Sequence, residues 1–115
     1  MRRRADFDRV FQQGRHNGGR LLALRSAPNG MGLSRFAYMI PRRVGKAVTR
    51  NRVRRRLREA LRSLPLVEGY DLVVSARQEA AAASFHALRA ELVMLLRRAR
   101  LLDASAGREP PPAPP

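Results

Sequence analysis

The stretch "KAVTRNRVRRRLREALR" (residues 46–62) combines an apolar stripe with a dense set of cations. Thr49 is a good helix N-cap, so we expect a helix over residues 50–64 that Pro65 ends. Apolar residues recur in it at helical spacing, and no arginine falls on that stripe, which consists of Val53, Leu57, Ala60, Leu61 and Leu64. This pattern predicts a helix that buries one face in a core and keeps its cations at the surface.

The segments before this helix predict a helix and two strands. Phe7, Val10 and Phe11 have helical spacing in "ADFDRVFQQG", and Gly14 is a plausible end for that helix. The polar stretch "RHNGG" (15–19) is typical of a flexible loop. The two runs that follow favour an antiparallel hairpin, with strands over residues 20–27 and 33–41 joined by the turn "PNGMG".

The segments after the basic helix predict one strand and one helix. The run "YDLVVSA" (70–76) is nearly all apolar, which indicates a strand buried on both faces. Ser84 is a candidate N-cap for a last helix over residues 85–102, with Phe85, Leu88, Leu92, Leu95, Leu96 and Ala99 facing inward.

These elements predict an α+β fold, a small α-β sandwich in the order α-β-β-α-β-α. Its helices pack on a mixed sheet of three to four strands. We expect a single domain over residues 1–102 and a disordered Pro-rich tail over 103–115, which ends in "GREPPPAPP".

Composition excludes several classes of protein. The chain has no Cys, so it can form neither a disulfide nor a thiolate metal site. His16 and His86 have no partners at ligand spacing, and we infer no metal site from them. No apolar run reaches the ~20 residues of a membrane span, and no apolar signal core follows the basic N-terminus. We therefore expect a cytoplasmic protein that does not contact a membrane.

The charge is distributed very unevenly. The net charge is +15, and residues 1–62 carry all of it, with 18 Arg or Lys against three acids. Residues 63–115 hold six of each sign. A one-sided cationic surface of this kind is typical of a protein that binds a polyanion.

The basic helix has two interpretations. Its arginines can form a solvated face around the apolar stripe, or they can meet an external anion. Residues 42–58 contain nine cations and no acid, so pairing within the helix is nearly absent and like charges repel. This favours a nucleic acid, gripped through its phosphates with little reading of base sequence. A DNA-reading helix-turn-helix is disfavoured because the basic helix lies between strands, and folded RNA fits better.

The sequence resembles the protein subunit of bacterial ribonuclease P. The resemblance is carried by "RVGKAVTRNRVRRRLREALR", by "DFDRVFQQGR" and by "YDLVVSAR", in the family's order over roughly residues 1–102. The family fold implies a left-handed β-α-β crossover through the basic helix. The general rule for parallel strands would give a right-handed one.

The resemblance implies a subunit of an endoribonuclease whose catalyst is its RNA. That RNA removes the 5′ leader of precursor tRNA with Mg²⁺, which the RNA mainly binds, and frees the mature 5′ end. The implied partners are the catalytic RNA and precursor tRNA, with no obligate protein partner. The residues implied to contact the catalytic RNA are Arg43, Lys46, Arg50, Asn51, Arg52, Arg54, Arg55 and Arg58.

A second implied surface is a cleft for the single-stranded leader between the first helix and the sheet. Phe7 and Phe11 would border it, with Arg9 and Arg25 supplying charge. Bases stack on aromatic rings with little sequence preference, which suits an enzyme that meets many different leaders. Phe36 and Tyr38 share one strand face, and for Phe36 the simpler interpretation is a core residue.

Two other classes of protein fit the sequence less well. An enzyme with its own active site is poorly supported, because the sequence shows no nucleophile–base pair, clustered carboxylates or phosphate loop. An RNA binder of the ribosomal-protein kind shares the size, charge and fold class. It would not need Phe7 and Phe11 beside a bound single strand.

Overall fold

The computed structural model describes residues 4–103, and most of the predicted Pro-rich tail lies outside this range. The secondary-structure elements, in chain order, are α1 (Arg4–Gln13), β1 (Arg15–Gly18), β2 (Leu22–Pro28), β3 (Arg35–Met39), the 3₁₀ turn η1 (Arg42–Val44), α2 (Ala47–Arg62), β4 (Tyr70–Ala76), the 3₁₀ turn η2 (Gln78–Ala82) and α3 (Phe85–Arg98). The predicted α+β class is confirmed, with one strand more than the predicted order contains.

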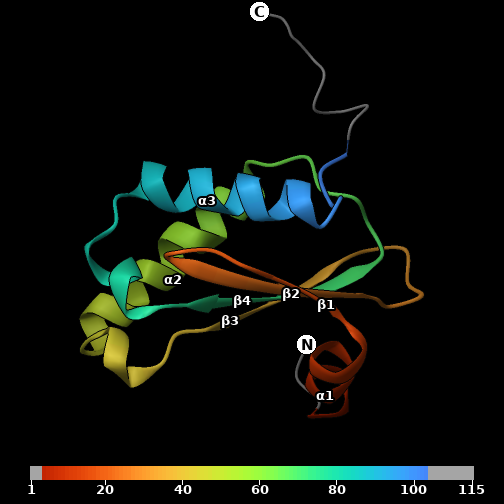
Figure 1. Cartoon of the computed structure of the whole chain (residues 1–115), viewed down its shortest axis with the longest axis horizontal. Coiled ribbons are helices and arrows are strands. Elements are labelled where there is room, and N and C mark those ends of the chain that lie inside the picture. The colour runs from red at the N-terminus through yellow and green to blue at the C-terminus, as the bar shows by residue number, and fades with distance from the viewer. Residues whose placement is uncertain (1–3, 104–115) are drawn as a thin grey trace, which may run out of the picture.

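The molecule has three layers around one mixed sheet (Figure 1). The strand order is β1-β2-β4-β3, in which β2 is antiparallel to both β1 and β4, and β3 is parallel to β4. Helices α2 and α3 cover one face and enclose the main core, while α1 lies against the opposite face. Helix α2 therefore forms the crossover between the parallel neighbours β3 and β4.

Strand β4 is the central strand, and the predicted burial of both its faces is confirmed. Leu72, Val74 and Ala76 belong to the core under α2 and α3, and Val73 packs with α1. The predicted hairpin of β2 with β3 is wrong, because β4 lies between them and pairs with both. A strand that is apolar on both faces is stabilised most in the interior of a sheet, where it has a neighbour on each side. The segment between β2 and β3 is long enough for β4 to lie between these two strands.

The stretch predicted as a loop, residues 15–19, instead forms the edge strand β1. Its four residues pair with β2 from Arg15 opposite Ser26 to Gly18 opposite Ala23. An edge strand with an exposed face needs few apolar residues, which is why its composition resembles a loop. Gly14 makes the entry to β1 possible, since a Cβ there would lie 2.3 Å from the Val10 carbonyl oxygen.

The apolar stripe on α2 is buried as predicted, but the helix ends differ. The helix begins at Ala47 after Lys46, so Thr49 lies in its first turn and is not its N-cap. Four of the five stripe residues are buried, and Leu64 packs beyond the helix end. The Ser84 cap is confirmed, since its hydroxyl accepts a hydrogen bond from Ala87 N at 3.0 Å. Helix α3 ends at Arg98, and Arg100 then adopts a left-handed conformation.

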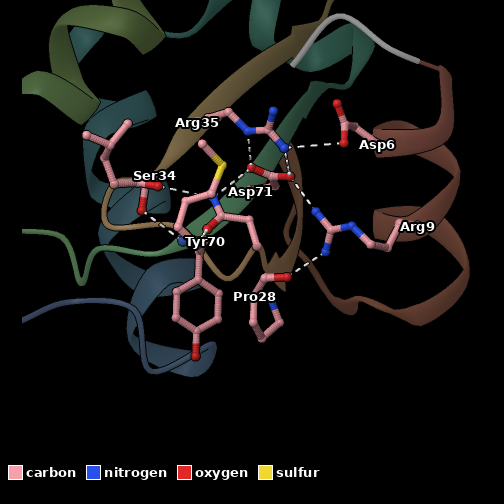
Figure 2. A network of polar contacts seen from close by, with 10 residues as sticks. Asp6, Arg9, Pro28, Ser34, Arg35, Tyr70 and Asp71 are labelled. Atoms are coloured by element: carbon pink, nitrogen blue, oxygen red, sulfur yellow. Dashed lines mark hydrogen bonds and ion pairs between the residues drawn. The ribbon is translucent and has the colours of Figure 1, made fainter.

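A buried carboxylate joins α1, β3 and β4 (Figure 2). Asp71 has no exposed surface, and Arg35 grips it with Nε to Oδ1 at 2.8 Å and Nη2 to Oδ2 at 2.7 Å. Arg9 on α1 donates to the same Oδ2 and to the Pro28 carbonyl, while Asn29 donates to Oδ1 at 3.0 Å. Arg35 also reaches Asp6 on α1 at 3.3 Å. Two arginines and one amide thus satisfy the buried charge and attach α1 to the sheet.

Electrostatics keep this carboxylate ionised. Burial acts to raise the pKa of Asp71, but the hydrogen bonds from Arg35 and Asn29 and the charges of Arg35 and Arg9 outweigh it and lower the pKa. A carboxylate with a lowered pKa stabilises the fold above its unfolded pKa of about 4, and this contribution is lost as the pH falls through the folded value.

We expect Asp71→Asn to reduce the free energy of unfolding in urea by about 2–3 kcal/mol at pH 7, because two arginines lose their shared partner. The difference from the wild type should shrink as the pH falls below about 4, where the unfolded chain binds a proton, and should be lost once the pH has passed the lower pKa of the folded carboxylate. Asp8→Asn is the matched control, since its pair with Arg4 is a surface contact at 4.0 Å and should contribute under about 0.5 kcal/mol. Equal losses in the two variants would contradict a structural role for the buried network.

Candidate nucleic-acid interface

The side of α2 turned away from the core presents a continuous polar row. Asn51, Arg55, Arg58 and Arg62 follow one another at intervals of three or four residues, and all four are exposed. The apolar Val48, 76% exposed, precedes this row by one turn on the same face. The spacing places these side chains on one helix face, opposite the buried stripe. Helix α2 therefore has a clean division between a core face and a cationic face.

Two further arginines of α2 are used by the fold itself. Arg56 donates from Nη1 to the Ala83 carbonyl at 2.7 Å, and Arg52 from Nη2 to the Ala81 carbonyl at 3.4 Å. Ala81 lies in η2 and Ala83 directly follows it, so these side chains join α2 to the η2 segment (residues 78–83) just before α3. The Nε of Arg52 is buried without a hydrogen-bond partner among the described residues. Arg52, predicted to contact RNA, thus has much of its polar group turned into the protein.

The other predicted RNA-contact residues lie at or near the surface. Arg50 donates from Nε to the Gly45 carbonyl at 3.1 Å, which ties the first turn of α2 to the loop before it. Arg54 donates to the Asn51 side chain at 3.0 Å. Arg43 in η1 and Lys46 before α2 are both exposed. Sequence reasoning did not select Arg42 and Arg62, which are also exposed, Arg42 in η1 and Arg62 on the exposed row of α2.

Within residues 4–103, none of these cations is paired with a carboxylate. The ion pairs of the described chain involve α1 or the buried Asp71, and none reaches η1 or α2. Glu59, the one acid of α2, is exposed and forms no such pair. The positive charge of this surface is therefore not neutralised by the described part of the protein, and its potential extends into solvent.

A second candidate surface lies where α1 meets the sheet. Phe7 packs partly buried against the small cluster of Val10, Ala27 and Val73. Phe11 is 37% exposed, and the guanidinium carbon of Arg25 lies 4.7 Å from its ring centroid, a cation–π contact. The structure thus brings together three of the four residues predicted for the leader cleft. Arg9 is directed at Asp71, and its charge is neutralised there.

Beside α1 the sheet presents an open strip. The register aligns Gly18 of β1, Ala23 of β2, Ser75 of β4 and Met39 of β3 in one row across the sheet. Adjacent aligned residues share a face, and this row lies next to the one that contains Arg25 and Val73. None of the four is buried, and three of them are small. The open strip therefore carries mainly small side chains and lies next to Arg25, which in turn contacts Phe11.

The open strip leads toward the cationic surface. At its β3 end lies a hollow of about 430 Å³, lined by Met39, Ile40, Pro41, Arg43, Ser75 and Ala76. Met39 and Ser75 belong to the strip, while Arg43 belongs to η1. A single-stranded nucleic acid that crossed the sheet along the strip would thus reach the exposed side chain of Arg43.

Neither a metal-binding cluster nor a membrane-spanning helix is found among residues 4–103. No group of three or more His, Asp or Glu side chains is placed to bind a metal among residues 4–103. The Glu91 carboxylate already has partners, since it accepts hydrogen bonds from the backbone N–H groups of Leu21 and Leu22 at 2.6 Å. No helix in the same range has the length and apolar character needed to cross a membrane.

The sequence matches known proteins over nearly its whole length. The family model described as Ribonuclease P matches residues 1–100. A protein of Roseiflexus sp. named "Ribonuclease P protein component" is 44% identical over 108 residues, which cover 91% of this chain and 88% of the relative. The protein of the same name from Caldanaerobacter subterraneus is 35% identical over 105 residues, or 90% of each chain.

Solved structures show the same arrangement of elements. The ribonuclease P protein of Thermotoga maritima superposes with a TM-score of 0.75 at 31% identity, over 85% of this chain and 94% of that one. That of Staphylococcus aureus has a TM-score of 0.80 at 24% identity, over 90% and 96%, and supports the fold alone. The fold and the cationic helix define a small α+β RNA-binding protein. Together with the sequence matches, they show that the chain belongs to the ribonuclease P protein family.

We expect Arg56→Met to lower the free energy of unfolding by about 1 kcal/mol, because the Ala83 carbonyl loses its charged donor while the apolar stem is kept. Arg55→Met is the matched control, since Arg55 lies one residue away on the exposed row, and its loss should change stability by under about 0.5 kcal/mol. Urea unfolding measures both. Equal stabilities would show that the Arg56 contact does not support the fold.

Proposed function

We propose that this chain is the protein subunit of ribonuclease P and that it binds the catalytic RNA through η1 and α2. The observation that carries the proposal is the exposed row of α2 in a member of this family, whose charge no carboxylate of the described chain neutralises. Phosphates are the natural partner of such a row, because their negative charges recur along the RNA and arginine grips them bidentately.

In this proposal the predicted RNA-contact residues differ in role. Arg55 and Arg58 on the exposed row and Arg43 and Lys46 before it contact phosphates directly. Asn51 and Arg54 act as a hydrogen-bonded pair on the same helix. Arg50 and Arg52 also hold local structure through backbone carbonyls, so their contribution to RNA binding is partly indirect.

We place the 5′ leader of precursor tRNA on the open strip beside α1. The exposed ring of Phe11 offers a stacking surface, and Arg25 lies over that ring and adds positive charge. Small side chains along the strip let a strand of any sequence lie close to the sheet. Phe7 packs α1 against the sheet one helical turn before Phe11, while Arg9 anchors α1 and does not supply cleft charge.

Cleavage of the leader belongs to the RNA subunit in this proposal, and the protein contributes substrate binding. Mg²⁺ is held mainly by RNA phosphates. The partners are the catalytic RNA and precursor tRNA, with no obligate protein partner, in the cytoplasm. The product is tRNA with a mature 5′ end.

The double variant Arg43→Gln/Arg55→Gln should bind in vitro transcribed ribonuclease P RNA more weakly. The slope of log affinity against log salt should flatten by about one for each lost phosphate contact. Filter binding over a salt series measures this. Arg97→Gln/Arg98→Gln removes the same charge from α3 and should leave the slope unchanged. If the two variants behave alike, only net charge matters and the assigned interface is wrong. If the wild type neither binds this RNA nor lowers the Mg²⁺ needed for precursor cleavage, the proposed function fails.

Phe11→Ala should weaken the binding of leader-bearing precursor tRNA to the holoenzyme by about fivefold or more, since one base loses its stacking surface. Binding of mature tRNA, which has no leader, should not change. Phe85→Ala on α3 is the control, because it removes a partly buried ring far from the strip. Equal losses for precursor and mature tRNA would indicate damage to the fold and would remove Phe11 from the leader site.

A further inference from the structure

A second groove lies on the other face of the sheet, between β3 and α2. It has a volume of about 370 Å³ and is lined by Phe36, Tyr38, Arg58, Leu61 and Arg62. Side chains alternate along β3, so Phe36 and Tyr38 face α2, whereas Ala37 and Met39 face the side of α1. The groove between β3 and α2 is therefore separate from the open strip assigned to the leader.

The groove presents aromatic surface that the core does not use. Phe36 is 37% exposed, so its interpretation as a core residue holds only in part. Tyr38 packs partly against the main core, and the buried Leu61 forms the floor between the two elements. Neither ring stacks on another aromatic ring within residues 4–103.

Two cations border this aromatic surface. Arg58 and Arg62 are one helical turn apart on α2, both are exposed, and neither is paired with a carboxylate of residues 4–103. Burial acts to raise the pKa of Tyr38, and the charges of Arg58 and Arg62 act in the opposite direction. Both guanidinium groups are thus close enough for the Tyr38 hydroxyl to sense their charge.

The groove lies beside an edge of the sheet. Strand β3 is the edge of the sheet and pairs with β4 on one side, so its outer side carries peptide groups outside the ladder. Such groups supply both donors and acceptors, which is what the edge of a nucleobase requires. Rings, cations and free peptide groups therefore meet in one place.

We propose that this groove binds one unpaired nucleotide of the catalytic RNA, with its base against Phe36 and Tyr38 and its phosphate between Arg58 and Arg62. The proposal rests on the proposed function and deepens it. Phosphate contacts alone do not distinguish paired from unpaired RNA, whereas a groove that holds a base selects an unpaired nucleotide. A base needs a flat apolar surface as well as a cation, and the groove offers both. An acidic peptide would need only the cations and the strand edge, so RNA is favoured.

The absence of Trp makes the groove directly observable. The chain contains two Tyr and no Trp, so Tyr70→Phe leaves Tyr38 as the one tyrosine fluorophore. A short oligouridine should quench its emission saturably, since a stacked base quenches a tyrosine ring. Tyr38→Phe, which leaves Tyr70, is the control and should show no saturable quenching. Quenching in the control alone would overturn the proposal, as would quenching of Tyr38 by oligoglutamate but not by oligouridine.

Affinity for the catalytic RNA provides the second readout. Phe36→Ala and Arg62→Gln should each weaken binding by about fivefold or more, as expected for a lost stacking or phosphate contact. The controls Leu33→Ala, at a residue 60% exposed, and Arg97→Gln should bind like the wild type. Circular dichroism of each variant should show an unchanged fold.

The outcomes separate the two proposals. If the wild type binds the catalytic RNA but neither groove variant weakens binding, the groove proposal fails and the proposed function stands. If the wild type does not bind that RNA, the proposed function fails first. If Phe36→Ala weakens only the binding of leader-bearing precursor, the nucleotide comes from the leader, and its assignment to the catalytic RNA is overturned.

Discussion

The buried carboxylate of Asp71 is the contact on which the arrangement of this protein depends. Arg35 holds it from the neighbouring strand and Arg9 from α1, so one charge joins two layers of the molecule. Helix α1 has little apolar area of its own to bury, with Val10 as its one buried residue. Its position over the sheet is therefore set largely by polar contacts, which have strict geometry. That position decides where Phe11 lies.

Arginine does two different jobs in this chain. Some arginines are structural, such as Arg35 at the buried acid and Arg56 at the η2 carbonyl, while those of the exposed row meet no carboxylate among residues 4–103. The same guanidinium fork serves both purposes, because it can grip a carboxylate, a carbonyl or a phosphate in a fixed plane. The two sides of the sheet differ as a result. One face of the sheet carries α1 and the small side chains of the open strip, and the other face is covered by α2, which bears the exposed cations, and by α3.

Periodicity was sufficient where burial is one-sided and local. It predicted the stripe of α2, the residue type of Ser84 predicted the cap of α3, and the apolar run of β4 predicted the burial of both its faces. It failed for β1, whose pairing depends on a partner and not on its own composition, and for the hairpin, which β4 divides. The candidate site, too, could be predicted only in part from the sequence. The lack of acids marked α2 as a binding surface, but the distinction between Arg52 and Arg55 depends on a carbonyl from a segment about 30 residues away.

The contacts of Arg52 and Arg56 with the η2 segment have a consequence for association. They hold α2 to the segment that leads into α3, so the helix that carries the outward guanidinium groups is attached to its neighbour along its side. In the proposed complex, docking on a folded RNA would then require little reorganisation, and the entropy lost would be confined mainly to the ends of a few long side chains. Part of the ordering that binding requires is thus already complete in the folded chain.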